Sequence, residues 1–119
     1  MGVTKVKLLL KNPTDLKRRT EADFLVDSGA HYTVLPKELV KKLGLKPAYE
    51  QEFVLADGKV IKRALAGVIV TLQNRELPIP VVLGHAGDSA LLGITTLETF
   101  GLMLDPFQRK IYPSKLMLS

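Results

Sequence analysis

The sequence predicts an all-β fold, mostly β with two short helices, in one domain covering residues 1–119. Three observations predict it. Apolar and polar residues alternate along several short segments, which is the period of a half-buried strand. Asp57-Gly58 lies between two apolar runs, a pattern typical of a hairpin turn. Aromatic residues make up only 6% of the chain and Trp is absent, so the core must consist of Leu, Val and Ile, which favour strands.

The first part of the chain is expected to form strands followed by a helix. The expected strands are Val3–Leu10, Ala22–Val26 and Tyr32–Leu35. Between the first two, Asn12–Asp15 carries turn residues that break the extended pattern. Pro36 suits the start of a helix over residues 37–43, and Gly44 suits its end.

A hairpin and further strands are expected in the second part. Phe53–Leu55 and Val60–Ile61 flank the turn residues Ala56–Lys59. Further expected strands are Leu65–Leu72, Leu77–Leu83, Leu102–Leu104 and Lys110–Tyr112. Pro78 and Pro80 cannot donate to a sheet ladder, so the strand that contains them is expected at a sheet edge.

A second short helix, residues 94–100, is expected to end at Gly101. The turn that joins the last two strands is expected at Asp105–Gln108.

Composition bounds the class of protein. The net charge of +5 raises the possibility of nucleic-acid binding. However, the basic segments Lys17–Arg19 and Lys41–Lys42 are separated along the chain and lack interleaved aromatic residues. Solvated surface is therefore the favoured interpretation, and no nucleic acid is expected as a partner. No segment reaches the run of about eighteen apolar residues that a membrane span needs, so no membrane contact is expected. The absence of Cys and of an export or anchoring signal favours a cytoplasmic location.

A metal site is not expected. His85 and Asp88 lie in a glycine-containing loop, but two candidate ligands are too few for a structural site. No cofactor is expected either.

Asp27-Ser28-Gly29 is the segment that points to chemistry. These are common turn residues, so the triplet is weak by itself, and Asp27 could be a turn or capping residue. Its context strengthens the case, because Phe24–Val26 and Thr33–Leu35 flank it closely and both should be buried. An unpaired charge is costly in such a place, so a functional reason for Asp27 is favoured.

The segment Phe24–Ala30 resembles the hydrophobic-hydrophobic-Asp-Ser/Thr-Gly-Ala signature of the retropepsin-like, or retroviral-type, aspartic peptidase family. Leu91-Leu92-Gly93, before the second helix, resembles that family's apolar-apolar-Gly triplet. The hairpin at Asp57-Gly58 falls between them, where the family has the flap that closes over substrate. Because the three features occur in the same order and span nearly the whole chain, the resemblance implies a closed acid-protease-like barrel, a retropepsin-type subunit with a flap hairpin.

This resemblance implies an aspartic endopeptidase that acts on polypeptides as a homodimer. Two Asp27 carboxylates, one from each copy, would share a proton, so that one activates a water and the other hydrogen-bonds the scissile carbonyl. Ser28 and Gly29 would support the active-site loop. The implied substrate-binding residues are Ala30, Phe53, Leu55, Asp57, Gly58, Val60 and Ile61. Turn chemistry also explains Asp57, and the apolar flap residues could equally be ordinary core.

The chain departs from viral members at two places. Those members usually carry an acidic residue after the first signature and a basic residue after the later Gly, whereas here His31-Tyr32 and Ile94-Thr95 stand there. Both changes occur together, which indicates a cellular or prokaryotic-type relative. A catalytically silent, dimeric peptide-binding or scaffold domain is the alternative function. The stretch Lys115–Leu118 is expected to build a dimer sheet with Val3–Leu10 through its apolar end.

Overall fold

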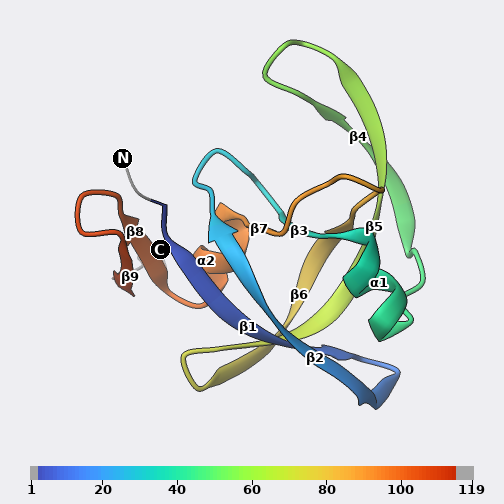
Figure 1. Cartoon of the computed structure of the whole chain (residues 1–119), viewed down its shortest axis with the longest axis horizontal. Coiled ribbons are helices and arrows are strands. Elements are labelled where there is room, and N and C mark those ends of the chain that lie inside the picture. The colour runs from blue at the N-terminus through green and yellow to red at the C-terminus, as the bar shows by residue number, and fades with distance from the viewer. Residues whose placement is uncertain (1–2, 115–119) are drawn as a thin grey trace, which may run out of the picture.

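A computed structural model describes residues 3–114 of the chain. Its elements, shown in Figure 1, are β1 (Lys5–Asn12), β2 (Asp15–Val26), β3 (Thr33–Leu35), α1 (Lys37–Leu43), β4 (Tyr49–Val54), β5 (Val60–Leu72), β6 (Arg75–Leu83), β7 (Leu91–Leu92), α2 (Ile94–Thr99), β8 (Leu102–Asp105) and β9 (Lys110–Pro113). The predicted class, mostly β with two short helices, is confirmed. The expected dimer strand at 115–118 lies outside the described residues.

Seven strands form one sheet in the order β1-β2-β7-β3-β6-β5-β4. A further antiparallel pairing of β1 with β5, in which Leu10 lies opposite Val70, joins the two ends. Among the described strands, only β4 of this sheet therefore stays outside the closed ring. Figure 1 shows β4 and the first part of β5 projecting from the ring as a long hairpin. Closure leaves few open edges on the body of the domain.

Several strands are longer than the sequence predicts, most clearly β2 and β5, because part of each lies away from the core. β2 begins at Asp15, and its first residues through Arg19 are all exposed and, except for Leu16, charged, so they show no apolar alternation. They extend instead by pairing with β1, as Arg19 does with Lys11. β5 runs without a break through Lys62 and Arg63, where two separate strands were expected, since those residues belong to the projecting hairpin.

The expectation that the proline-containing strand forms a sheet edge is wrong for β6 as a whole. β6 lies between β5 and β3, inside the sheet. The parallel pairing with β3 begins only at Val81, however, so Pro78 and Pro80 precede it. The prolines therefore lie in the part of β6 that pairs with β5 but not with β3, where a missing amide hydrogen on the β3 side costs no strand hydrogen bond.

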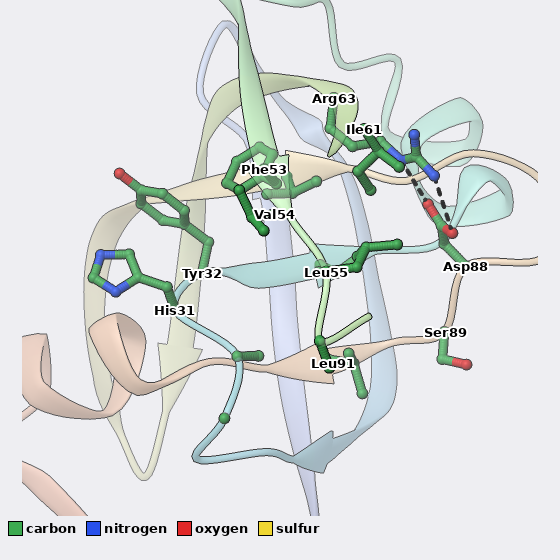
Figure 2. A pocket seen from close by; sticks show the side chains of 15 residues that line it. His31, Tyr32, Phe53, Val54, Leu55, Ile61, Arg63, Asp88, Ser89 and Leu91 are labelled. Carbon is green, nitrogen blue, oxygen red and sulfur yellow. Dashed lines mark hydrogen bonds and ion pairs between the residues drawn. The ribbon is translucent and has the colours of Figure 1, made fainter. Parts of the chain in front are cut away.

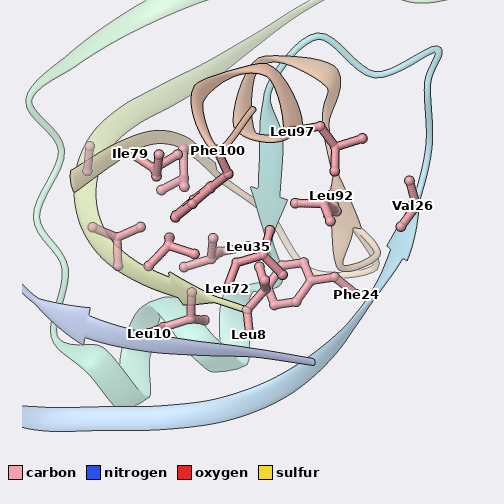
Figure 3. Packing of buried hydrophobic residues seen from close by; sticks show 14 of the residues in the cluster. Leu8, Leu10, Phe24, Val26, Leu35, Leu72, Ile79, Leu92, Leu97 and Phe100 are labelled. Carbon is pink, nitrogen blue, oxygen red and sulfur yellow. The ribbon is translucent and has the colours of Figure 1, made fainter. Parts of the chain in front are cut away.

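The core fills the ring and is almost entirely aliphatic. Figure 3 shows side chains from β1, β2, β3 and β5 meeting those of α2. The fully buried members include Leu8, Leu10, Phe24, Leu35, Val68, Val70, Leu92 and Leu97. Phe100, just after α2, is also buried and covers one end of the cluster. The loop that begins at Asp27, directly after β2, therefore rests on a packed support.

The end of α1 shows why its boundary was predictable. Gly44 has a φ of 67°, the left-handed conformation common after a helix, and its amide reaches the carbonyl oxygens of Val40 and Lys41. The buried Asn12 donates its side-chain amide to the Leu43 carbonyl at 2.8 Å, satisfying a free helix-end acceptor. Arg18 lies directly against Gly44, so the basic segment Lys17–Arg19 lies close to the end of α1, whose last turn carries Lys41 and Lys42.

The last two strands form a separate hairpin beside the ring. Leu104 and Ile111 pack against the core, while Met103 and Tyr112 face outward. Phe107, in the turn, is 94% exposed. Within residues 3–114, neither helix has the length and apolar character to cross a membrane.

Candidate active site

Asp27 follows the last residue of β2 at the place where that strand runs parallel to β7. The Asp27 amide donates to the Leu92 carbonyl at 3.0 Å, which ties the start of the loop to the second half of the chain. The Oδ1 atom of Asp27 accepts the Gly29 amide at 2.9 Å, and the Ala30 amide donates to the Asp27 carbonyl at 3.0 Å. These bonds form a tight turn that fixes the carboxylate while leaving it half exposed.

The loop then crosses the start of α2, and the two segments bond through their main chains. The Ile94 amide donates to the Ala30 carbonyl at 2.9 Å, and the Thr95 amide donates to the His31 carbonyl at 3.0 Å. These are the places where viral members were expected to carry an acidic and a basic side chain. Main-chain hydrogen bonds therefore join the two segments here without an ion pair.

A buried hydroxyl pair completes this crossing, and sequence reasoning missed it. Thr33 Oγ1 accepts the Gly93 amide at 3.0 Å and lies 2.6 Å from Thr96 Oγ1. A side chain on Gly93 would press on Tyr32, with its Cβ 2.5 Å from the Tyr32 carbonyl oxygen. We call residues 27–35 and 90–96 together the active-site crossover.

Beside the crossover lies a cavity of about 410 Å³, covered on one side by the β4–β5 hairpin. Five of the residues that the sequence predicts for the active-site loop or for substrate line it: Gly29, Ala30, Phe53, Leu55 and Ile61. Figure 2 shows the hairpin residues pointing toward Tyr32 and Leu91 on the crossover side, where Val34 also lines the cavity. The lining is mostly apolar, which suits apolar side chains of a ligand.

The structure places the other predicted site residues outside this cavity. Asp27 and Ser28 lie beyond its lining, and Ser28 is exposed. At the hairpin tip Asp57 accepts the Lys59 amide at 2.8 Å, and Gly58 has a φ of 86°, so both residues serve the turn. Val60 is 54% exposed.

An ion pair in the cavity wall was not predicted. Arg63 Nε donates to Asp88 Oδ2 at 3.0 Å, and Asp88 also accepts the His85 amide at 2.8 Å. Partial burial raises the pKa of Asp88, but hydrogen bonds from Arg63 and the His85 amide, with the nearby positive charge, outweigh it and lower the pKa. Only the two opposite charges, 25 residues apart, could have signalled this pair in the sequence.

An aromatic contact lies elsewhere along the same cavity. The rings of Tyr32 and Phe53 meet edge to face, with centroids 6.1 Å apart. His31 packs edge-on against Tyr32 at 4.9 Å. Neither contact was predicted, because Tyr32 was expected only as an extended residue.

No group of three or more His, Cys, Asp or Glu residues in the described part of the chain is arranged to hold a metal ion. The two candidate ligands of the loop are His85 and Asp88. The Asp88 carboxylate there bonds to Arg63 and to the loop's own main chain.

A model of the family described as "gag-polyprotein putative aspartyl protease" matches residues 16–99, which contain Asp27, the hairpin and Leu91–Gly93. Among solved structures, the chain is similar to the EIAV protease complexed with the inhibitor HBY-793. That similarity has a TM-score of 0.65 and 17% sequence identity, and it covers 98% of this chain and 94% of that chain. The chain is also similar to the solution structure of the Simian Foamy Virus (mac) protease, with a TM-score of 0.58 and 16% identity over 82% of this chain and 94% of that one. Comparison with curated proteins returned no match.

Proposed function

The chain belongs to the gag-polyprotein aspartyl protease family, and from that premise we propose that it is an aspartic endopeptidase active as a homodimer. Asp27 of each copy supplies one carboxylate. The observation that carries the proposal is the position of Asp27 in the active-site crossover, where main-chain bonds fix the loop and leave the carboxylate half exposed. The Gly29 amide donates to the Asp27 carboxylate in a turn contact like that of Asp57 with Lys59, so turn chemistry does not separate the two residues. Asp27 differs in lying where its loop bonds to Leu92 and α2, within the residues that the family model matches.

The chemistry follows from bringing two such carboxylates together. Two adjacent carboxylates cannot both ionise cheaply, so the pair holds one proton and titrates as a unit. The ionised Asp27 removes a proton from a water as its oxygen attacks the peptide carbonyl carbon. The protonated Asp27 donates a hydrogen bond to the carbonyl oxygen as negative charge develops there. A proton then passes to the leaving nitrogen as the C–N bond breaks.

A second copy is required because the chain contains a single Asp-Ser/Thr-Gly triplet. An isologous dimer supplies the second carboxylate by symmetry. Ser28 is exposed beside Asp27, which suits a contact with the partner's loop. The exposed outer face of the β8–β9 hairpin, with Met103, Tyr112 and Phe107, offers apolar surface for the same partner.

The cavity beneath the hairpin is proposed to take apolar side chains of an extended polypeptide. Phe53, Leu55 and Ile61 contribute from the hairpin, and Ala30 contributes from the active-site loop. In this proposal, Asp57 and Gly58 at the hairpin tip form the turn and do not contact the substrate.

The test is proteolysis from acid to neutral pH by the natural protein and by Asp27→Asn. We expect the substitution to lower kcat by about 10³-fold or more, because the pair loses its ionised base. A statine-type transition-state mimic should inhibit the natural protein. Asp23→Asn is the matched control, since Asp23 is an exposed acid on β2, the strand that leads into Asp27.

Three results would contradict the proposal. Cleavage that survives Asp27→Asn would remove the catalytic assignment. Sedimentation showing only monomer in samples that cleave would remove the shared pair. Binding of the mimic and of peptides with no cleavage at any pH would favour the silent peptide-binding alternative.

A further inference from the structure

The β4–β5 hairpin leaves the ring at Arg63. Between Tyr49 and Val54, β4 pairs with β5 alone among the described strands. β5 gains its second partner, β6, at Ala64, which lies opposite Leu83. Arg63 is thus the last residue of the freely projecting part of β5, at the point where the hairpin joins the ring.

At this point Arg63 bonds to the body of the domain. Its Nε lies 3.0 Å from Asp88 Oδ2 and its second terminal nitrogen lies 3.5 Å from Asp88 Oδ1, while the first terminal nitrogen donates to the Lys62 carbonyl at 2.9 Å. The side chains of Arg63 and Asp88 are 17% and 30% exposed, so water screens the pair only in part. Figure 2 shows both side chains in the cavity wall, across the cavity from Tyr32 and His31.

Asp88 is a firm attachment because its own loop is fixed. Its carboxylate accepts the His85 amide, and its amide donates to the His85 carbonyl at 3.0 Å. The Gly84 amide donates to the Leu35 carbonyl at 2.7 Å, and a Cβ on Gly84 would lie 2.5 Å from that oxygen. The loop therefore sits against β3, which is part of the active-site crossover.

The other strand of the hairpin has a different attachment. Phe53 of β4 meets the edge of Tyr32, which follows the active-site loop. The cavity thus lies between an aromatic contact on β4 and an ion pair on β5 (Figure 2). An aromatic contact tolerates sliding and tilting, whereas a two-pronged guanidinium–carboxylate pair has a defined geometry.

We propose that Arg63 and Asp88 are positioning residues that hold the hairpin over the cavity and so set the affinity for polypeptide, without taking part in the chemical step. This inference rests on the proposed function, because it assigns the cavity to substrate. It predicts that breaking the pair affects binding more than turnover.

The main test compares Arg63→Met, Asp88→Asn and the double variant in a peptidase assay. Each single variant should raise KM by about 3- to 10-fold and leave kcat within about twofold. The double variant should be no worse than either single one, because both remove the same contact. If Arg63→Met fails to fold, Asp88→Asn still tests the idea, since its amide keeps the shape of the side chain.

The other described ion pair supplies the matched control. Lys11 Nζ lies 2.8 Å from Glu76 Oε2, on β1 and β6 and outside the cavity lining. Lys11→Met and Glu76→Gln should leave KM unchanged. If these control variants raised KM as much as the Arg63 and Asp88 variants do, the effect would be explained by general destabilisation, and the proposal would be overturned.

A second readout is independent of catalysis. The chain has no Cys, so a nitroxide label on Lys59→Cys reports the mobility of the hairpin tip alone. In an Asp27→Asn background, Asp88→Asn should make the label more mobile, and Glu76→Gln should not. An unchanged label with unchanged KM would overturn the positioning role, whereas failure of all variants to cleave would count against the proposed function and leave this measurement valid.

Discussion

The active-site crossover and the β4–β5 hairpin border the same cavity but are held in opposite ways. In the crossover, Thr33, Gly93 and Thr96 are buried, and short hydrogen bonds join segments that are 60 or more residues apart. In the hairpin, Val54 is 73% exposed and Val60 is 54% exposed. From Arg63 toward the hairpin tip, β5 pairs only with β4. One side of the cavity is thus fixed by buried long-range hydrogen bonds, whereas the other is exposed and depends on local strand pairing.

This division suits a reaction that needs fixed groups and a removable cover. Catalytic carboxylates must be held in place before substrate arrives, which a buried crossing of loops provides. A polypeptide must also enter and leave, which requires an element of low local stability. The crossover should therefore be intolerant of change, and the hairpin should respond to change mainly in binding.

The largest expected effect comes from adding one methyl group inside the crossover. Gly93→Ala would place a Cβ 2.5 Å from the Tyr32 carbonyl oxygen, and main chain cannot move aside as a flexible side chain can. We expect a loss of about 3 kcal/mol or more in the free energy of unfolding, measured by urea denaturation. Gly67→Ala in β5 is the control, because a Cβ there meets nothing within 4 Å, and it should change stability by less than about 0.5 kcal/mol. Equal losses from the two substitutions would show that the crossover is not tightly packed.

A smaller loss is expected from removing one hydroxyl of the crossover. Thr33→Val keeps the shape of the side chain but leaves the Gly93 amide without its acceptor and Thr96 without its partner. Leaving buried polar groups unpaired costs about 1–3 kcal/mol, measured as before. Thr71→Val, which removes an exposed bond to Glu76, should cost clearly less. Adding Thr96→Val to Thr33→Val should cost less than the sum of the two, and full additivity would argue that the hydroxyls do not interact.

Local signals made part of this molecule predictable. Gly44 after α1, the Asp57-Gly58 turn and the Asp27-Ser28-Gly29 turn each have a conformation that neighbouring residues determine. The sequence therefore indicated where the hairpin and the active-site loop would lie. Asp57 shows the limit of such signals, because turn chemistry explains its contacts without any substrate.

Contacts between distant segments could not be predicted in the same way. Thr33 and Thr96 look like ordinary strand and helix residues until the crossover buries them against each other. Arg63 and Asp88 resemble other surface charges, and only the bend of the hairpin brings them together. The start of β2 was missed for a related reason, since its exposed charges pair with β1 without facing the core.

The smallest expected effect uses pH to separate the two regions. Because the folded-state pKa of Asp88 lies below its ordinary value of 3.8, the stability that its ionised form contributes is present above that value and is lost as pH falls through the lowered pKa. Asp88→Asn should therefore cost about 1 kcal/mol or less near neutral pH, with the cost shrinking below about pH 3.8 in urea denaturation. In an Arg63→Met background the dependence should weaken, because the hydrogen bond and charge of the guanidinium are gone while the His85 amide remains. Thr33→Val should show no such trend, since Thr33, Gly93 and Thr96 do not titrate. The same pH dependence with and without Arg63 would show that the hairpin is not held by this pair, and the contrast between a titratable attachment and the neutral hydrogen bonds of Thr33, Gly93 and Thr96 would be lost.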